Sequence, residues 1–263
     1  MKDHWRPMFQ AWSGLARPVS VASEVIAAIK AEVSSITGRI LLLGTTAGLL
    51  QTGRNLTAID RSAELAQNAR QSAHVAAVAG DWAAMPFSKA SFSACIGDGS
   101  FISLDYPHRL TRVLDEIARC LTPGGTLACR VFLRPDVPET VGELLTAAKA
   151  HRLSFQHFKF KFAMAVAPDL GSHTTIPIAA LPGRFDAEFP DRGSLAARTG
   201  WDRAEIDTID IYRASRSKYS FPTRTQFLDA LPAKLILRKI RPVEGHPFGQ
   251  EWPIVVLDRK IDD

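Results

Sequence analysis

Apolar positions along this chain follow two patterns that together predict alternating strands and helices. Short continuous apolar runs predict strands buried on both faces at residues 39–43, 56–59, 74–78, 92–96 and 126–133. Between them, residues 62–71 predict a helix with Ser62 as its N-cap, and residues 106–120 carry apolar positions at helical spacing. Alternation of this kind over about 135 residues is typical of a parallel sheet with right-handed crossovers and helices on both faces.

The segments that flank this core predict mostly helices. Residues 1–36 are expected to be helical, and within them residues 21–33 repeat an apolar position every four residues behind Ser20 as the N-cap. Residues 45–53 predict a turn that enters a short helix. The remaining predicted elements are helices at 139–151 and over most of 152–216, and strands at 235–240 and 253–257.

We therefore expect an α/β fold with a doubly wound, Rossmann-like, mostly parallel sheet of seven strands and helical additions over one edge. A single domain over residues 1–263 is expected. Its parts are N-terminal helices (1–36), a ligand-binding core (37–135), a helical region (136–230) and the last two strands (231–263). In the helical region, the alternation of Phe158, Phe160 and Phe162 fits either a strand or part of an irregular helix.

Glycines and carboxylates follow the predicted strands. The segment Gly44–Gly48 comes after the first strand, and Asp60, Asp81 and Asp98 come after the next three. Ligands of open α/β sheets bind beyond the carboxyl ends of the strands, where glycine lets the backbone approach closely. A carboxylate at the end of the second strand can accept hydrogen bonds from ribose hydroxyls.

Five segments also carry a family resemblance: ILLLGTTAG, LTAID, AGDWAAMPF, FSACIGDGS and LTPGGTL. In this order they are similar to the motif series of class I S-adenosylmethionine-dependent methyltransferases, over roughly residues 39–133. The resemblance implies the Rossmann-like methyltransferase sheet, S-adenosyl-L-methionine as the cofactor, and methylation of an acceptor as the activity of this transferase.

The resemblance further implies which residues bind the cofactor. They are Gly44, Thr45, Thr46, Gly48, Asp60, Arg61, Gly80, Asp81, Trp82, Gly97 and Asp98. The glycine segment would approach the methionyl end and Asp60 would hold the ribose hydroxyls. Asp81 and Trp82 would bind the adenine, and Gly97 and Asp98 would lie beside the transferable methyl group.

Two positions depart from the family pattern. Leu42 stands where the family usually has an acidic residue, and Thr46 replaces the second glycine of the loop. The methionyl ammonium would then be bound by a backbone carbonyl or by Asp98. We expect Asp98 on an exposed rim between two glycines, where it either binds that ammonium or orients the acceptor. His108, at the start of a helix, is the other candidate catalytic residue.

Composition narrows the choice of partners. The chain has 32 basic and 27 acidic residues, a net charge of +5 that is evenly spread, so no nucleic-acid partner is expected. No apolar stretch approaches the roughly 18 residues that span a bilayer, so no membrane association is expected. Three scattered cysteines in apolar stretches predict buried free thiols and a cytoplasmic location, and the histidines lack metal-ligand spacing.

The function predicted from the sequence is in-line methyl transfer to a small-molecule acceptor with an oxygen or nitrogen nucleophile. Residues 1–36 and 135–230 are expected to surround that acceptor. Two alternatives stay open. One is a methyltransferase-like protein that binds the cofactor without transferring its methyl group, which Leu42 motivates. The other is a nicotinamide-dependent enzyme, although the loop is Gly-x-x-x-Gly and lacks the spacing of a dinucleotide fingerprint.

Overall fold

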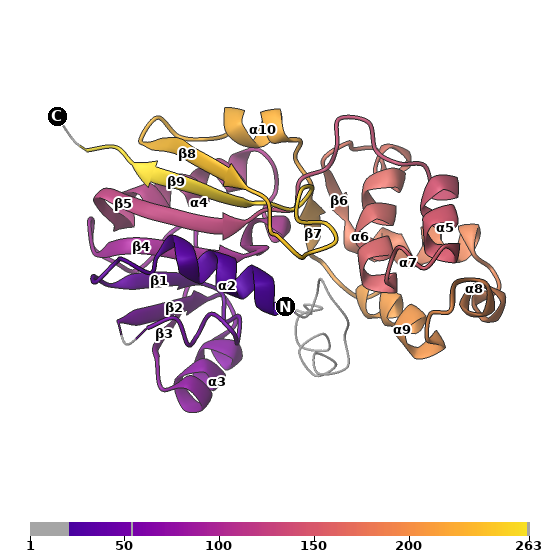
Figure 1. The fold of residues 1–263 in the computed structure, drawn as a ribbon, viewed down its shortest axis with the longest axis horizontal. Helices are drawn as coiled ribbons and strands as arrows, with labels where there is room; N and C mark the ends of the chain where they lie inside the picture. Colours follow the sequence, from indigo (N-terminus) through magenta and orange to yellow (C-terminus); the bar gives the residue numbers. More distant parts are fainter. Residues whose placement is uncertain (1–20, 54, 262–263) are drawn as a thin grey trace. The chain divides into compact units, whose positions relative to one another are not determined.

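The computed structural model describes residues 21–53 and 55–261, and within them two compact units are recognised (Figure 1). The sheet unit comprises Val21–Ile102, Tyr106–Leu133 and the chain from Pro222 onward. The helical unit includes Ser103–Asp105 and Arg134–Phe221. Each unit has its own buried apolar core. The expectation of one domain over 1–263 remains a prediction.

A seven-stranded sheet is the framework of the sheet unit. Its strands are β1 (Ile40–Leu43), β2 (Leu56–Asp60), β3 (Ala76–Ala79), β4 (Phe92–Asp98), β5 (Leu121–Arg130), β8 (Leu235–Arg241) and β9 (Ile254–Arg259). They lie in the order β3-β2-β1-β4-β5-β9-β8. Strands β1 to β5 are parallel, and β9 runs antiparallel to both of its neighbours. The predicted doubly wound, mostly parallel sheet is confirmed.

The order of the strands reverses between β1 and β4, because the chain winds outward from β1 to β3 and then returns to the other side of β1. Such a reversal opens a crevice beyond the carboxyl ends of the two central strands. Leu43 pairs with Gly97 at this end of the sheet. The turns that follow β1 and β4 are therefore neighbours at the switch point.

Helices cover both faces of the sheet (Figure 1). Helices α2 (Ser23–Glu32) and α3 (Ala63–Ala73) share one apolar cluster with the sheet residues Leu42 and Ile96, and α4 (His108–Cys120) lies behind the sheet. Ser62 caps α3 as predicted, because its hydroxyl accepts from the backbone N–H of Leu65 at 3.2 Å. Helix α10 (Arg224–Asp229) completes the helices of this unit. Ser20, the N-cap predicted for residues 21–33, lies outside the described residues, and the prediction is wrong because α2 begins at Ser23 with Ala22 at its N-cap.

The expectation of a short helix after β1 is wrong. Residues 47–51 form successive turns, and the backbone N–H groups of Leu49 and Leu50 both bond to the carbonyl of Thr46. The connection to β2 is short, and helix α2 already covers this part of the sheet. A side chain at Gly48 would meet the Ile26 Cδ1 of α2 at 1.9 Å. Gly48 is therefore required for close packing between this turn and α2.

The helical unit contains α5 (Val141–Lys149), α6 (Phe155–Val166), α7 (Leu181–Glu188), α8 (Arg192–Thr199) and α9 (Arg203–Asp207). Short 3-10 segments at Pro168–Leu170, Ile178–Ala180 and Thr208–Tyr212 link them, and β6 (Thr175–Pro177) pairs with β7 (Lys218–Ser220). The helical prediction for most of 152–216 is confirmed. The alternating phenylalanines resolve into helix α6.

Helix α6 is buried on all sides, which explains why its sequence shows no clear helical period. Phe155, Phe158 and Phe162 pack against the rings of Phe185 and Trp201, with ring centroids 5.0 to 5.8 Å apart. These aromatic residues form the core of the helical unit. The aromatic character of this region is therefore explained by packing.

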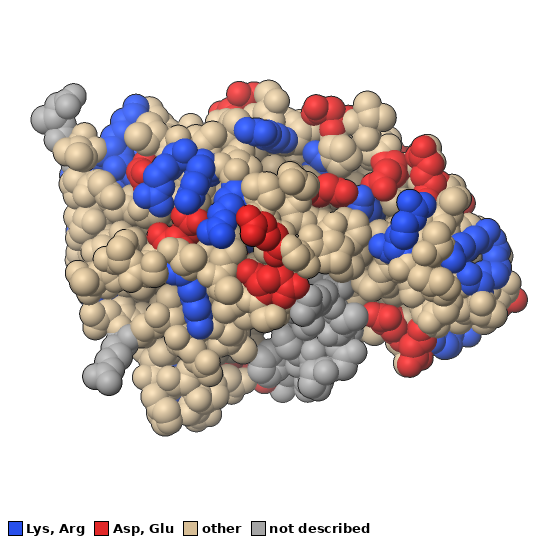
Figure 2. All heavy atoms as spheres, viewed as in Figure 1, with Lys and Arg blue, Asp and Glu red and all other residues tan. Residues whose placement is uncertain are grey.

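One surface of the sheet unit gathers basic side chains, which are visible in Figure 2 where α2 and β8 lie in Figure 1. Glu32 of α2 is buried beneath them and pairs with Lys239 at 2.8 Å and Arg241 at 2.9 Å. Burial alone would raise the pKa of Glu32, but hydrogen bonds and charge from both cations outweigh it and lower that pKa. This pairing joins α2 to the edge strand β8.

The three cysteines, Cys95, Cys120 and Cys129, are free and buried, as predicted. Burial raises the pKa of each thiol, most of all for Cys95 and Cys129. Among the described residues, no helix is long and apolar enough to cross a membrane.

Candidate cofactor site

The turn after β1 is opened by Gly44, whose φ of +93° favours glycine. Its N–H donates to the carbonyl of Ile59 in β2 at 2.8 Å. A side chain at this position would have its Cβ 3.9 Å from both Asp60 Oδ2 and Trp82 Cζ2. The structure thus brings three of the predicted residues, Gly44, Asp60 and Trp82, to one place beyond the strand ends.

Asp60 ends β2, and the following helix fixes its carboxylate. Its Oδ1 accepts from the backbone N–H of Ser62 at 2.8 Å, while its carbonyl accepts from the N–H of Gly80 at 2.9 Å. The side chain is held by the loop that enters α3 and is only partly buried. Its neighbour Arg61 is exposed. Asp60 therefore presents a positioned carboxylate beside Gly44.

Trp82 is held in place by its own ring nitrogen. The indole Nε1–H donates to the carbonyl of Ile59 at 2.9 Å. This hydrogen bond leaves an aromatic face that is partly accessible next to Gly44, in a position where a planar ring could stack. The AGDW segment thus places an aromatic side chain beside Gly44.

Asp81 has a partner that the sequence analysis missed. Its carboxylate accepts from Arg109 Nη2 at 2.7 and 2.8 Å and from the N–H of Ala83 at 2.9 Å. Burial acts to raise the pKa of Asp81, but these hydrogen bonds and the charge of Arg109 lower it overall. The only sequence signal for Arg109 is its place in the first turn of the helix after β4.

Asp98 requires a correction, because it does not lie on an exposed rim. Its side chain is 4% exposed and forms an ion pair with Arg130, which is 1% exposed. Arg130 Nε lies 2.6 Å from Oδ1, and Nη2 lies 3.0 Å from Oδ2. The strands are in register here, so the two residues are direct cross-strand neighbours. A charged residue at the end of β5 was not considered in the sequence analysis.

At the two glycines that flank Asp98, the space that a side chain would take is already occupied by other protein atoms, so these glycines do not expose the carboxylate. A Cβ at Gly97 would meet Ser100 Oγ at 2.5 Å, and one at Gly99 would meet the Phe132 ring at 2.4 Å. Protein side chains therefore fill the space beside the carboxylate. His108, the other catalytic candidate, is the exposed first residue of α4.

The family departure at Leu42 also has a structural counterpart. Leu42 is completely buried in the cluster shared with α2 and α3, and it faces apolar neighbours in place of a ligand. Thr45 and Thr46 lie in the partly buried turn after β1. An acidic contact for the methionyl ammonium is therefore not provided at this position of the loop.

Comparison with known proteins relates part of the sheet unit to a known family. Residues 43–129 match a family model described as a methyltransferase domain. The strand order and the antiparallel β9 agree with that similarity. Over these residues the sheet unit resembles class I methyltransferase domains. The cofactor of such domains is S-adenosylmethionine, as the sequence analysis expected.

Solved structures resemble this chain beyond residues 43–129. A Methanosarcina mazei protein described as a SAM-dependent methyltransferase is 14% identical, with a TM-score of 0.51 over 85% of this chain and 93% of that one. A geranyl diphosphate methyltransferase, in complex with GPP and sinefungin, is 12% identical, with a TM-score of 0.52 over 93% and 81%. At these identities the likeness shows the fold alone. No curated protein matches the sequence.

A third solved structure carries a different name. A Rhodobacter sphaeroides protein provisionally described as a Zn-dependent alcohol dehydrogenase is 15% identical, with a TM-score of 0.62 over 98% of this chain and 96% of that one. This likeness also shows only the fold. In the part of this chain that the structure describes, no group of three or more His, Cys, Asp or Glu side chains could hold a metal ion. The expectation of no metal remains a prediction.

The residues at the strand ends fit an adenosyl cofactor at one end better than at the other. The bare backbone at Gly44, beside a carboxylate and an indole, suits a ribose and an adenine ring. At the methionyl end, the acidic residue is replaced by Leu42 and Asp98 is engaged by Arg130. Backbone groups of the two turns are left to bind that end.

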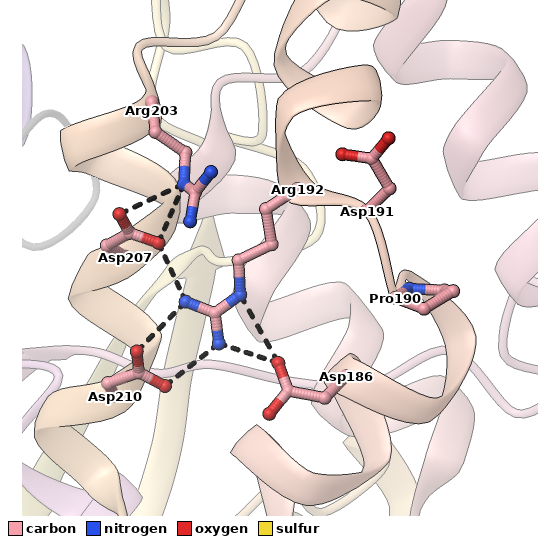
Figure 3. A pocket seen from close by; sticks show the side chains of 7 residues that line it. All are labelled: Asp186, Pro190, Asp191, Arg192, Arg203, Asp207 and Asp210. Carbon is pink, nitrogen blue, oxygen red and sulfur yellow. Dashed lines mark hydrogen bonds and ion pairs between the residues drawn. The ribbon is translucent and has the colours of Figure 1, made fainter.

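A separate hollow of about 610 Å³ lies in the helical unit and is lined by charged residues (Figure 3). Arg192 stands at its centre and pairs with Asp186 at 2.6 Å, Asp207 at 2.7 Å and Asp210 at 2.9 Å. Arg203 also reaches Asp207 at 3.0 Å. All the lining charges except Asp191 are thus bonded to one another, which indicates a network that joins α7, α8, α9 and the segment Thr208–Tyr212.

Proposed function

We propose that this chain binds S-adenosylmethionine beyond the carboxyl ends of β1, β2 and β3 and transfers its methyl group to a small-molecule acceptor. The observation that carries this proposal is the meeting of Gly44, Asp60 and Trp82 at one point. These residues come from three separate connections of the sheet. If Gly44 served only the turn, or if Asp60 were only a solvated residue at the strand end, the three residues would have no need to lie together.

In this proposal each residue binds or orients one part of the cofactor. Asp60 accepts hydrogen bonds from the ribose hydroxyls, and Trp82 stacks against the adenine. Asp81 stays ionised because Arg109 holds its pKa low, so it can accept from the adenine amino group. The turn Gly44–Gly48, with Thr45 and Thr46, approaches the methionyl end. Arg61, Gly80 and Gly97 are proposed to line the same site.

The sulfonium of the bound cofactor supplies an activated methyl group, so the protein has mainly to align the acceptor with it. We propose an oxygen or nitrogen nucleophile and in-line displacement. One structural relative is a geranyl diphosphate methyltransferase, which supports a small molecule as the acceptor. His108 is proposed as a base only for an acceptor that keeps its proton at neutral pH. A cytoplasmic location, with no nucleic-acid or membrane partner, belongs to the same proposal.

A second candidate function rests on the methionyl end of the site. The buried Leu42 and the engaged Asp98 favour a protein that binds the cofactor but does not transfer its methyl group. Both candidate functions include binding of the cofactor, but only the enzyme transfers its methyl group. A nicotinamide-dependent enzyme differs from both in the cofactor that it binds.

Calorimetry and a turnover assay separate these candidates. We expect one-to-one binding of S-adenosylmethionine and S-adenosylhomocysteine, and no binding of NAD⁺ or NADP⁺. With a panel of small phenols, amines and carboxylic acids, formation of S-adenosylhomocysteine above the acceptor-free rate would support the enzyme. Binding without turnover on a broad panel would favour the non-catalytic protein. Heat with NAD⁺ and none with the adenosyl ligands would refute the proposed function.

A further inference from the structure

The ion pair between Asp98 and Arg130 lies where the central strands of the sheet end. Both charged groups are almost inaccessible, and they meet through two N–H to oxygen contacts of 2.6 and 3.0 Å. The guanidinium also lies 5.0 Å from the centre of the Phe132 ring. A charged pair buried this deeply rarely adds net stability over apolar residues of the same size. Its place in the fold therefore calls for another explanation.

The pair belongs to a set of bonds that fixes the turn after β4. On one side, the hydroxyl of Ser100 donates to the carbonyl of Leu43 at the end of β1, at 3.0 Å. On the other side, the N–H of Gly99 donates to the carbonyl of Arg130 at the end of β5, also at 3.0 Å. Asp98 and Arg130 add a side-chain bond on this second side. The turn is thus tied to both neighbouring strands at the switch point.

We propose that Arg130 is a positioning residue for the cofactor site, and that it acts through Asp98 to hold the backbone of residues 98–100. This inference rests on the proposed function. Because Asp98 is buried and bonded, it contributes by fixing the turn. The backbone of that turn lies next to Gly44 across the β1–β4 pairing. With Leu42 in place of an acid, binding at the methionyl end depends on backbone groups, whose positions are set by this pair.

The experiment replaces both charges at once, so that neither is left buried alone. In the double variant Asp98→Leu with Arg130→Met, apolar side chains of similar length occupy the space, and such replacements often preserve stability. The control is Glu32→Leu, which removes another buried carboxylate of the sheet unit, one that lies outside the turns after β1, β2 and β4. Binding of S-adenosylhomocysteine is measured by calorimetry and thermal midpoints by scanning.

We expect the double variant to keep a thermal midpoint within a few degrees of the wild type while its Kd for S-adenosylhomocysteine rises at least about tenfold, because a site displaced by less than 1 Å already loses much of its complementarity. The Glu32→Leu variant should change Kd less than about twofold. In the conservative variant Arg130→Lys, which keeps the charge but cannot form the two-point contact, Kd should rise by an intermediate factor.

An unchanged Kd in the folded double variant would overturn the inference and leave the proposed function intact. If the double variant does not fold, Arg130→Lys decides, and an unchanged Kd there has the same meaning. Failure of the wild-type protein to bind S-adenosylhomocysteine would instead overturn the proposed function and this inference with it. An equal loss of affinity in Glu32→Leu would show that general destabilisation causes the effect.

Discussion

The two units of this chain bury charged residues in different ways. At its strand ends, the sheet unit buries a carboxylate and a guanidinium against each other, 4% and 1% exposed. The helical unit surrounds Arg192 with three aspartates at the margin of an open hollow (Figure 3). It also buries Lys159 of α6, 1% exposed, with no hydrogen-bond acceptor near its Nζ among the described residues.

This difference indicates what the charged residues of each unit contribute to its structure. In the sheet, hydrogen bonds of the strands already fix the fold, so a buried pair is left to fix a turn. Among the described residues of the helical unit, five α-helices of at most 12 residues have little regular hydrogen bonding between them. Side-chain ion pairs then join elements that would otherwise be held by apolar packing alone. Substitutions should therefore affect the units by different mechanisms.

The largest effect is expected for Arg130→Met alone, because it leaves the Asp98 carboxylate buried without its cation. Breaking a buried pair in this way costs about 3–5 kcal/mol of unfolding free energy. Chemical denaturation at pH 7 measures the loss, and Asp98→Leu in the same background should recover most of it. A loss below about 1 kcal/mol would show that water reaches the pair, and the contrast between the units would fail.

A smaller effect is expected for Arg192→Ala in the helical unit. This change removes hydrogen bonds to three carboxylates from a side chain that is 10% exposed. Hydrogen bonds to charged groups contribute about 1.5–3 kcal/mol, but the partners are partly solvated, so we expect about 1–3 kcal/mol in total, decreasing in high salt. The control Arg184→Ala removes the more exposed pairs with Asp169 and Glu188 and should cost under about 1 kcal/mol. Equal losses would contradict a special role for Arg192.

The burial of Lys159 in the helical unit predicts that the free energy of unfolding depends on pH. Burial lowers its pKa from 10.5 to about 7, partly opposed by the charge of Glu205. The unfolded chain therefore binds more protons than the folded chain between these two values, and stability should rise with pH across that window, by on the order of 1 kcal/mol per pH unit.

The test compares Lys159→Met with the exposed control Lys149→Met from pH 7 to pH 10. The Lys159 variant should be more stable than the wild type at pH 7 and should lose the rise with pH, because no buried amine has to be neutralised. Lys149→Met should follow the wild-type curve. If Lys159→Met keeps the full slope, another group titrates in this range and the interpretation of Lys159 is wrong.

Much of the sheet unit could be predicted because its signals are local. Buried parallel strands appear as short apolar runs, and the residues that follow them lie at one edge whatever the details of packing. For this reason the position of Gly44, Asp60 and Trp82 at the strand ends could be predicted, while their role in binding stays a prediction. The missed partners, Arg109 and Arg130, lie 28 and 32 residues from the aspartates that they bind. No local pattern could pair them.

Two errors have the same physical origin. Asp98 was expected to be exposed because it stands between glycines, but those glycines make room for Ser100 and Phe132. The helix expected after β1 is replaced by turns packed on α2. In both cases a neighbour distant in sequence occupies the space. The all-round burial of α6 likewise removed the periodicity that marks a surface helix.

The binding of the cofactor beside Gly44 is tested by calorimetric titration. S-adenosylhomocysteine is titrated into the wild type and into two variants, Asp60→Ala and Asp115→Ala. Asp60→Ala removes the carboxylate that accepts from the ribose, and Asp115→Ala removes an exposed carboxylate in the middle of α4. We predict one-to-one binding to the wild type, at least about tenfold weaker binding to Asp60→Ala, and unchanged binding to Asp115→Ala. Equal affinity in all three proteins would contradict the placement of the site at the strand ends.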